Sequence, residues 1–232
     1  MDEPPLIRLQ RAALIVAVGT AVALAFGLAA GVAVVATERW IDVPLYTWLV
    51  ENHRPDSGWT AFTDAYTQIG DPLPMVVQVA VGTVLLCVVF GRRWWLPAVA
   101  LPLALGLEWG LQQSLAWILD RGHPPLGTGT YPSGGSARFV VIYGLVLVLA
   151  TVRWPAISQR WRIAGAALVA GLSLFEAYTR LYLLKHWPTD VPAGLVIGAI
   201  LLTTLSAAVA IVARGANQVS AALPEELESP SP

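Results

Sequence analysis

Residues 12–37 read AALIVAVGTAVALAFGLAAGVAVVAT, a stretch without a single charged side chain. A helix needs about 20 apolar residues to cross the hydrocarbon core of a bilayer, so this stretch is long enough to span it. The stretch follows Arg8 and Arg11, as the apolar part of a signal peptide does. It is longer than that part usually is, and we therefore interpret it as a retained transmembrane helix.

Five further apolar stretches approach or meet the same length. They are rich in Leu and Ala and lack the ten-residue alternation of an outer-membrane barrel. We therefore predict an all-α membrane protein, a six-transmembrane-helix bundle that forms one domain over residues 1–213. The six predicted spans cover residues 12–37, 74–91, 95–119, 134–152, 163–185 and 189–213. Residues 214–232 are polar and rich in Glu and Pro, which predicts a disordered acidic C-terminal tail.

Composition supports a membrane protein. Of the 232 residues, 12% are charged and 56% are hydrophobic, whereas about a quarter of the residues of a soluble domain are charged. The formal net charge of −1 gives no reason to expect a nucleic-acid partner. Cys87 is the single cysteine, which excludes an intrachain disulfide and a CxxC metal site.

The distribution of Lys and Arg predicts the orientation, because these residues accumulate on the cytoplasmic side. We expect a multi-pass protein of the plasma (inner) membrane with both termini in the cytoplasm. Residues 38–73, 120–133 and 186–188 then face outward. The first of these loops mixes aromatic and acidic residues, which predicts interfacial helices. On this topology the inner segments hold Arg8, Arg11, Arg92, Arg93, Arg153, Arg160, Arg162 and Arg214, and the outer ones hold Arg39, Arg54, Arg121 and Lys185.

Several strongly polar residues lie inside the predicted spans, where each is costly unless paired or functional. Glu176 and Arg180 are four residues apart, so they share a helix face on which they can form an ion pair. Glu176 is therefore expected to be a partner that orients Arg180. The remaining polar residues of this kind are expected to form hydrogen bonds between helices: Glu108, Gln112 and Gln113.

The outer ends of three predicted spans carry groups suited to an anion. Pro132-Ser133-Gly134-Gly135 is typical of a helix start, where free backbone N–H groups and the positive end of the helix dipole bind phosphate oxygens. Three arginines of these segments are expected to bind the same oxygens and to stabilise the charge that builds up in a phosphoryl transition state. They are Arg121, Arg138 and Arg180.

His186 precedes Asp190 by four residues in the same region. A carboxylate bonded to one ring nitrogen fixes the histidine tautomer and leaves the other nitrogen free to attack phosphorus. The chemistry indicated is phosphoryl transfer through a phosphohistidine. No Walker loop, HExxH pair or carboxylate cluster is present, so we expect neither a metal nor a cofactor.

At these residues the chain resembles the type 2 phosphatidic acid phosphatase (PAP2) superfamily, whose membrane members hydrolyse lipid phosphates and diphosphates. The third family motif, SRxxxxxHxxxD, is similar to residues 179–190, with Thr179 in place of Ser. The resemblance implies that His186 is the nucleophile, Asp190 its orienting partner and Arg180 a phosphate ligand.

The other two family motifs differ from this chain. The second, PSGH, has a leaving-group acid where Gly135 stands here. In the first, KxxxxxxRP, alignment on Pro124 places His123 at the arginine and Ala116 at the lysine. One hypothesis for how the site works without these motif residues is that His123 donates the proton to the leaving group while Arg121 and Arg138 supply the missing positive charge. The other is that a diphosphate leaving group needs less protonation than an alkoxide.

We therefore expect a lipid phosphatase that acts on the outer face of the membrane, with a polyprenyl diphosphate favoured over a phosphatidic-type monophosphate. Its partners are then the lipid substrate and the bilayer. Two alternatives remain open at this point. One is an inactive relative that binds a lipid phosphate without cleaving it, and the other is a phosphotransferase that uses the same histidine.

Overall fold

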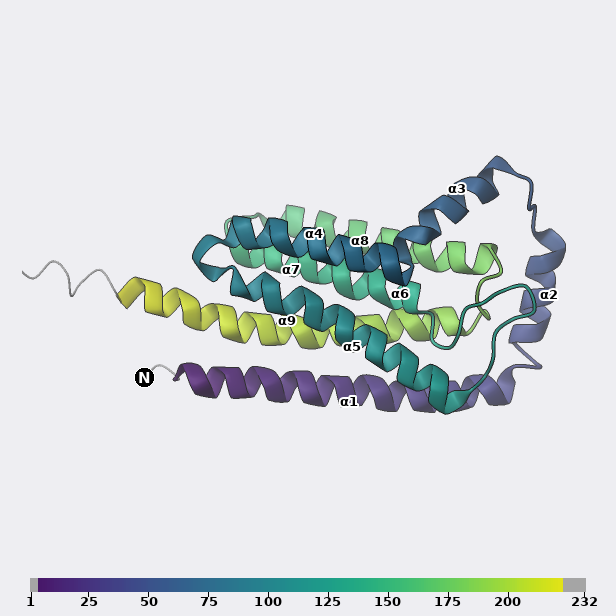
Figure 1. Cartoon of the computed structure of the whole chain (residues 1–232), viewed down its shortest axis with the longest axis horizontal. Helices are drawn as coiled ribbons and strands as arrows, with labels where there is room; N and C mark the ends of the chain where they lie inside the picture. Colours follow the sequence, from purple (N-terminus) through teal and green to yellow (C-terminus); the bar gives the residue numbers. More distant parts are fainter. Residues whose placement is uncertain (1–3, 223–232) are drawn as a thin grey trace, which may run out of the picture.

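The computed structural model describes residues 4–222, in which helices form a bundle and no strand occurs (Figure 1). Three short turns connect some of the helices: the 3-10 turns η1 (Gln68–Gly70) and η2 (Gly91–Arg93), and the π-helical turn η3 (Phe139–Tyr143), which joins α6 to α7. The helices are α1 (Pro5–Thr37), α2 (Asp42–Asn52), α3 (Gly58–Thr67), α4 (Pro72–Phe90), α5 (Trp95–Leu119), α6 (Gly134–Arg138), α7 (Gly144–Arg153), α8 (Gln159–Tyr182) and α9 (Asp190–Ala222).

The long helices fall where the six spans are predicted, within a few residues at most ends. Four of them are long and apolar enough to cross a membrane: Pro5–Thr37, Pro72–Arg93, Gly134–Arg153 and Asp190–Arg214. The prediction is confirmed for these four. Helices α5 and α8, which carry Glu108 and Glu176 with other polar residues, are not among these four. That these two also span the membrane stays a prediction.

Helices α2 and α3 occupy the first predicted outer loop, residues 38–73, and lie at one end of the bundle (Figure 1). Their helical structure agrees with the prediction, and their placement at the membrane interface stays a prediction. Helix α9 continues to Ala222, so residues 214–222 are helical and differ from the disordered tail predicted there. The rest of that predicted tail, residues 223–232, lies outside the described residues.

Small residues bring helix backbones together beside the end of the bundle that carries α2 and α3. A β-carbon at Gly194 would overlap the carbonyl oxygen of Ser133, and one at Gly198 would overlap the backbone of Ala137. Helix α9 therefore packs directly on the backbone of α6, as GxxxG spacing permits. In consequence the first turn of α9 lies next to the first turn of α6.

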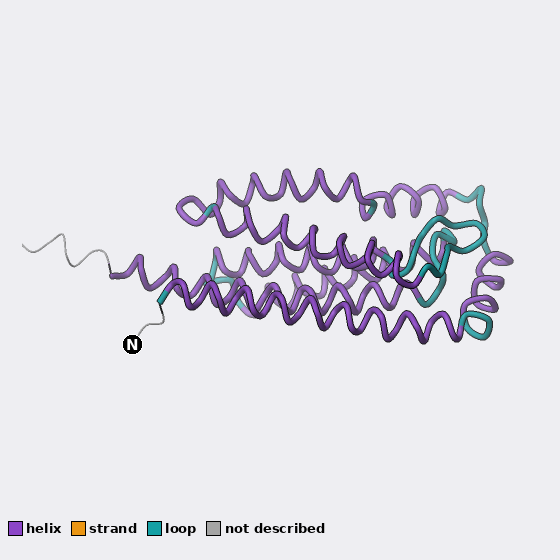
Figure 2. Tube along the Cα trace, turned by 60° about the horizontal axis from the view of Figure 1, so that its bottom comes forward, coloured by secondary structure: helices purple, strands orange, loops and turns teal. Residues whose placement is uncertain are grey.

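The helices run side by side and the longer loops gather at one end (Figure 2). We call this end the loop end; it comprises residues 38–71, 120–133 and 183–189. At the opposite end lie the N-terminus of α1, the α4–α5 and α7–α8 connections and the last part of α9 (Figure 1). We call it the arginine end, after Arg92, Arg93, Arg153 and Arg214.

Candidate functional site

A cavity of about 160 Å³ opens at the loop end of the bundle. Residues from five parts of the chain line it: the turn before α4, the middle of α5, the α5–α6 loop, the start of α6 and the α8–α9 region. Its polar and charged side chains include Asp71, Gln112, Arg138, Arg180 and His186, and the backbones of Gly70, Gly129, Gly134 and Gly135 complete its wall. The cavity thus joins residues more than a hundred positions apart in the sequence.

His186 lies in the loop between α8 and α9 and is only 4% exposed. Its Nδ1 faces Oδ2 of Asp190 at 3.7 Å, and Asp190 is fully buried. Burial lowers the pKa of His186 below its ordinary value of 6.5, against the neighbouring Asp190 carboxylate, which raises it. The ring is therefore neutral at pH 7, which is the form that has a lone pair for nucleophilic attack.

Arg121 holds Asp190 from the side away from His186. Its Nη1 donates to Oδ1 of Asp190 at 2.6 Å, and its other nitrogens bind Asp42 and, at 3.1 Å, Glu38. The side chain is 1% exposed and does not line the cavity. Since three carboxylates surround this guanidinium, the arrangement suits it to fixing Asp190 rather than to binding a phosphate.

Helix α2 strengthens the same cluster. Asp42, at its start, accepts hydrogen bonds from the backbone N–H of Thr189 at 2.8 Å and from its hydroxyl at 2.7 Å. The N-terminus of α9 is therefore tied both to α2 and to the loop that carries Arg121. These contacts set the position of Asp190, and through it the orientation of the His186 ring.

Arg180 extends from α8 into the cavity between two carboxylates. Its Nε donates to Glu176 at 2.6 Å, which is the ion pair predicted from their spacing. Its Nη1 donates to Asp71 at 2.8 Å, and its Nη2 donates to the carbonyl of Thr67 at 2.9 Å. A guanidinium has five N–H donors, so these three bonds leave two for a ligand in the cavity.

Arg138 contributes the second guanidinium of the cavity. Its Nε is 3.2 Å from the carboxylate of Glu108, and its Nη2 donates to Gln112 at 3.1 Å. Gln112 therefore makes an interhelical hydrogen bond, as predicted, whereas Glu108 contacts Arg138 as an ion pair and its carboxylate oxygens accept no hydrogen bond. Arg138 is 3% exposed, so its charge is balanced by Glu108 within the protein.

The start of α6 supplies backbone N–H groups to the cavity. Ser133 precedes the helix with its hydroxyl 3.0 Å from that of Ser136, and Gly134 and Gly135 line the cavity directly. With η3 and α7, this helix runs on to Arg153, so its first turn carries the dipole of a long helix. The turn lies at the cavity, and its anion-binding role stays a prediction.

Gly135 packs against Arg180 where the PSGH motif has an imidazole. A β-carbon at this position would lie 2.5 Å from Nη2 of Arg180 and equally close to the rest of the guanidinium. Arg138 instead lies against Gly134, whose added β-carbon would overlap it. The space that the absent histidine leaves is therefore filled by Arg180 and not by Arg138.

Of the nine predicted site residues, five line the cavity, two more lie directly beside lining residues, and two lie apart from it. His123 is exposed, its Nδ1 is 3.2 Å from the carbonyl of Pro124, and it does not line the cavity. Arg121 is buried behind Asp190. The seven that meet at the loop end are Ser133, Gly134, Gly135, Arg138, Arg180, His186 and Asp190.

Sequence reasoning missed Asp71 and the glycines that shape the cavity. Asp71 lies between Gly70 and Pro72 in the turn before α4, and a Gly-Asp-Pro turn at a helix start is the signal that marks it. Gly129 packs on the His186 ring so closely that a β-carbon there would overlap it. Among the residues that the structure describes, no three His, Cys, Asp or Glu side chains are grouped to hold a metal ion. Metal independence stays a prediction.

Comparisons with known proteins follow this geometry. The model of the PAP2 superfamily matches residues 13–212. The fold is similar to that of a solved structure, described as a transmembrane PAP2 type phosphatidylglycerolphosphate phosphatase from Bacillus subtilis. The two share 16% sequence identity with a TM-score of 0.68, over 86% of this chain and 96% of that one. None of the curated proteins matches the chain in sequence.

Proposed function

Because this chain belongs to the PAP2 superfamily, we propose that it is a membrane phosphatase that hydrolyses a lipid-linked phosphate at the loop end. One observation carries the proposal. A neutral, buried histidine backed by a buried carboxylate opens on a cavity that holds two guanidinium groups and a helix N-terminus. This set of groups matches what an in-line phosphoryl transfer to nitrogen requires.

In the first step Nε2 of His186 attacks the phosphorus, an N–P bond forms, and the bond from phosphorus to the leaving oxygen breaks with its electrons on that oxygen. The unused N–H groups of Arg138 and Arg180 and those at the start of α6 bind the phosphoryl oxygens. Asp190 stabilises the positive charge that develops on the ring. Water then displaces the imidazole, phosphate leaves, and the electron pair of the N–P bond returns to Nε2.

The lack of a second imidazole favours a substrate with a good leaving group. Asp71 is the remaining titratable side chain of the cavity besides His186 and the two arginines, and it forms an ion pair with Arg180. A diphosphate releases a phosphate monoester, which is stable as an anion, whereas a monophosphate must release an alkoxide. We therefore propose a polyprenyl diphosphate as the substrate. A phosphomonoester, such as the phosphatidylglycerolphosphate named for the Bacillus subtilis protein, is the second candidate.

We place the reaction on the extracytoplasmic face of the plasma membrane, with both termini in the cytoplasm. The distribution of Lys and Arg supports this orientation, since the predicted inner segments carry twice as many as the outer ones. The lipid then enters from the side, with its tail among the helices and its phosphate in the cavity.

The deciding experiment measures phosphate release by the purified protein from a polyprenyl diphosphate and from a phosphatidic-type monophosphate. We expect release from the diphosphate, its loss in His186→Ala, and its retention in the matched variant His123→Ala, whose ring lies outside the cavity. Acid-labile phosphate on His186 after rapid quenching would identify the intermediate. Equal release by wild type and His186→Ala would contradict the proposal.

Binding without cleavage is the second candidate function, and it is favoured by Gly135 and Ala116, which stand where the family motifs have the leaving-group acid and a lysine. It predicts lipid binding that depends on Arg180 and no release of phosphate. A phosphotransferase would instead form a phosphorylated product only when an acceptor alcohol is present. The same assay with and without acceptor separates all three functions.

A further inference from the structure

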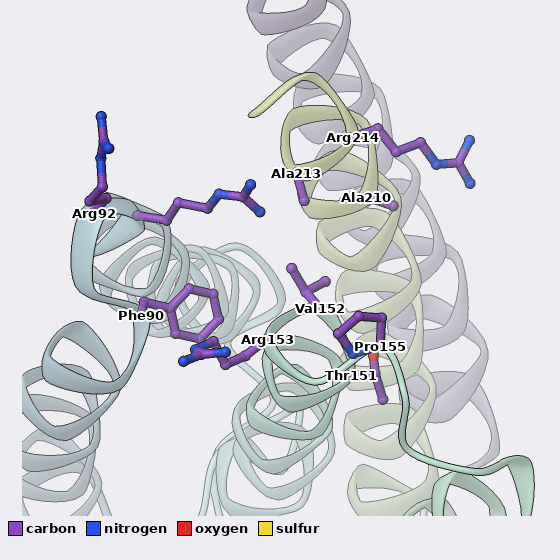
Figure 3. A pocket seen from close by; sticks show the side chains of 10 residues that line it. Phe90, Arg92, Thr151, Val152, Arg153, Pro155, Ala210, Ala213 and Arg214 are labelled. Carbon is purple, nitrogen blue, oxygen red and sulfur yellow. The ribbon is translucent and has the colours of Figure 1, made fainter. Parts of the chain in front are cut away.

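A second cavity lies at the arginine end, about 620 Å³ in volume. Three helix segments surround it: the α4–η2 junction, the end of α7 and residues 210–214 of α9. Four of its ten lining residues are arginines and none is acidic: Arg92, Arg93, Arg153 and Arg214. In the view of Figure 3, Arg92 and Arg214 stand on opposite rims of the cavity, with Phe90, Val152 and Pro155 between them.

The four guanidinium groups have no carboxylate partner in the described part of the chain. Arg153 donates to the carbonyl of Val89 at 2.8 Å and lies over the Trp154 ring, 5.7 Å from its centroid. Neither contact neutralises its charge. Arg92, Arg153 and Arg214 are exposed and Arg93 is half-buried, so N–H donors of this cluster remain available. A cavity with four positive charges and no negative one attracts an anion.

The cavity lies where the apolar part of the bundle ends. Three of the four helices that are apolar enough to span a membrane end at arginines that line it, namely Arg93, Arg153 and Arg214. Its remaining surface is largely apolar, with Phe90, Val152, Ala210 and Ala213 among the lining residues. Cationic groups next to an apolar wall at a bilayer boundary match a phosphate headgroup with its acyl chains below it.

We propose that this cavity is a binding site for the phosphate group of an anionic phospholipid, supplied by the leaflet at the arginine end. The site lies at the opposite end of the bundle from the His186 cavity and does not depend on catalysis. A phosphodiester lipid such as phosphatidylglycerol suits it, because binding requires a negative headgroup and an acyl chain but no cleavable terminal phosphate. Free phosphate shares the charge and lacks the chain, and the experiment separates these two sources.

The experiment uses the full chain in detergent and counts bound phosphatidylglycerol by native mass spectrometry, with phosphatidylcholine and inorganic phosphate as parallel probes. Each arginine near a membrane surface contributes about 1 kcal/mol to the binding of acidic lipid, which corresponds to roughly fivefold in affinity. Arg92→Gln/Arg214→Gln is therefore expected to weaken phosphatidylglycerol binding about 25-fold. Arg160→Gln is the matched control, because Arg160 is also exposed at this end but does not line the cavity.

Equal binding by the double variant and wild type would overturn the proposal, as would equal binding of phosphatidylcholine and phosphatidylglycerol. Inorganic phosphate that binds where the lipid does not would overturn the assignment to a lipid. A second variant, Ala210→Leu, narrows the apolar wall without changing any charge. It is expected to weaken binding of the lipid several-fold, and it keeps the test decisive if the double variant fails to fold.

Discussion

The arginines at the two ends of this bundle differ in what surrounds them. At the loop end Arg121, Arg138 and Arg180 are buried, and each is within 3.2 Å of at least one carboxylate. At the arginine end the four cavity-lining arginines have no such partner in the described residues. A buried cation requires compensation, whereas a cation near water does not. The arginines of the first group, including the two that line the His186 cavity, are therefore held in place by carboxylates, whereas those of the second group have no such partner and keep their full charge available to a ligand.

The largest effect that this comparison predicts is on stability. Arg121→Gln leaves the buried Asp42 and Asp190 carboxylates without their cation. We expect it to lower the free energy of unfolding by about 3–5 kcal/mol. Arg214→Gln, at the other end, is expected to change it by no more than about 0.5 kcal/mol. Denaturation of both variants in one detergent measures the difference, and equal losses would remove the distinction between the two ends.

The second largest expected effect is on activity and comes from Gly135, which packs against the guanidinium of Arg180. Gly135→Ala puts a methyl group against the guanidinium and displaces it, which we expect to lower kcat/KM about 100-fold, as misplacement by about 1 Å does. Gly135→His, which recreates the PSGH motif, is expected to lower activity for the same reason.

Gly171→Ala is the matched control for these glycine variants. Gly171 lies in α8, and no atom is close to the position of an added β-carbon. We expect its activity to equal that of wild type. Higher activity in Gly135→His would show that the cavity has room for the second imidazole after all.

A third expected effect is that pH changes kcat/KM at the loop end but does not change lipid binding at the arginine end. Since burial lowers the pKa of His186, kcat/KM is expected to fall tenfold per pH unit only below a midpoint that lies under 6.5. Removal of the Asp190 charge in Asp190→Asn is expected to shift this midpoint to still lower pH. Phosphatidylglycerol binding at the arginine end is expected to stay constant between pH 5 and 8, because arginine keeps its charge. A pH–rate profile with its midpoint above 6.5 would contradict the assignment.

The lowered pKa of His186 also makes the free energy of unfolding depend on pH. The unfolded chain binds a proton at His186 near pH 6.5, while the folded chain resists protonation to a lower pH. The contribution of this group is therefore complete above pH 6.5 and is lost as the pH falls toward the folded pKa. Denaturation at pH 7.5 and pH 5.5, compared between wild type and His186→Ala, measures that contribution.

The smallest predicted effect comes from Asp71. Its side chain is 37% exposed and binds Nη1 of Arg180, so it competes with a phosphate for that nitrogen. Partly exposed ion pairs contribute about 0.2–1 kcal/mol, so we expect Asp71→Asn to lower KM by up to about fivefold. Steady-state kinetics tests this. A fall in kcat with an unchanged KM would instead assign Asp71 a part in proton transfer.

Local patterns made much of the fold and part of the site predictable. Apolar runs place the long helices within a few residues, because membrane thickness sets their length. The Glu176–Arg180 pair also follows from spacing, since four positions are one helical turn, and the short separation of His186 from Asp190 keeps these two close although His186 lies in the loop before α9.

The non-local parts of the site could not be predicted in the same way. Arg121 is near His186 in the fold, as expected, but its partners Glu38 and Asp42 come from another loop and turn it away from the cavity. Asp71 reaches Arg180 from 109 positions away, through packing that no periodicity encodes. Residue type predicted where the charges gather, and only the tertiary structure decides which charge faces which.

The contact of Gly194 and Gly198 with the start of α6 has a further consequence. It ties the helix that begins with Asp190 to the helix whose first turn faces the phosphate, backbone against backbone. The wall around this pair comes from loops and turns, such as Asp71 and Gly129. Substitutions in that wall are therefore expected to change the shape of the cavity while the two helix starts keep their relative position.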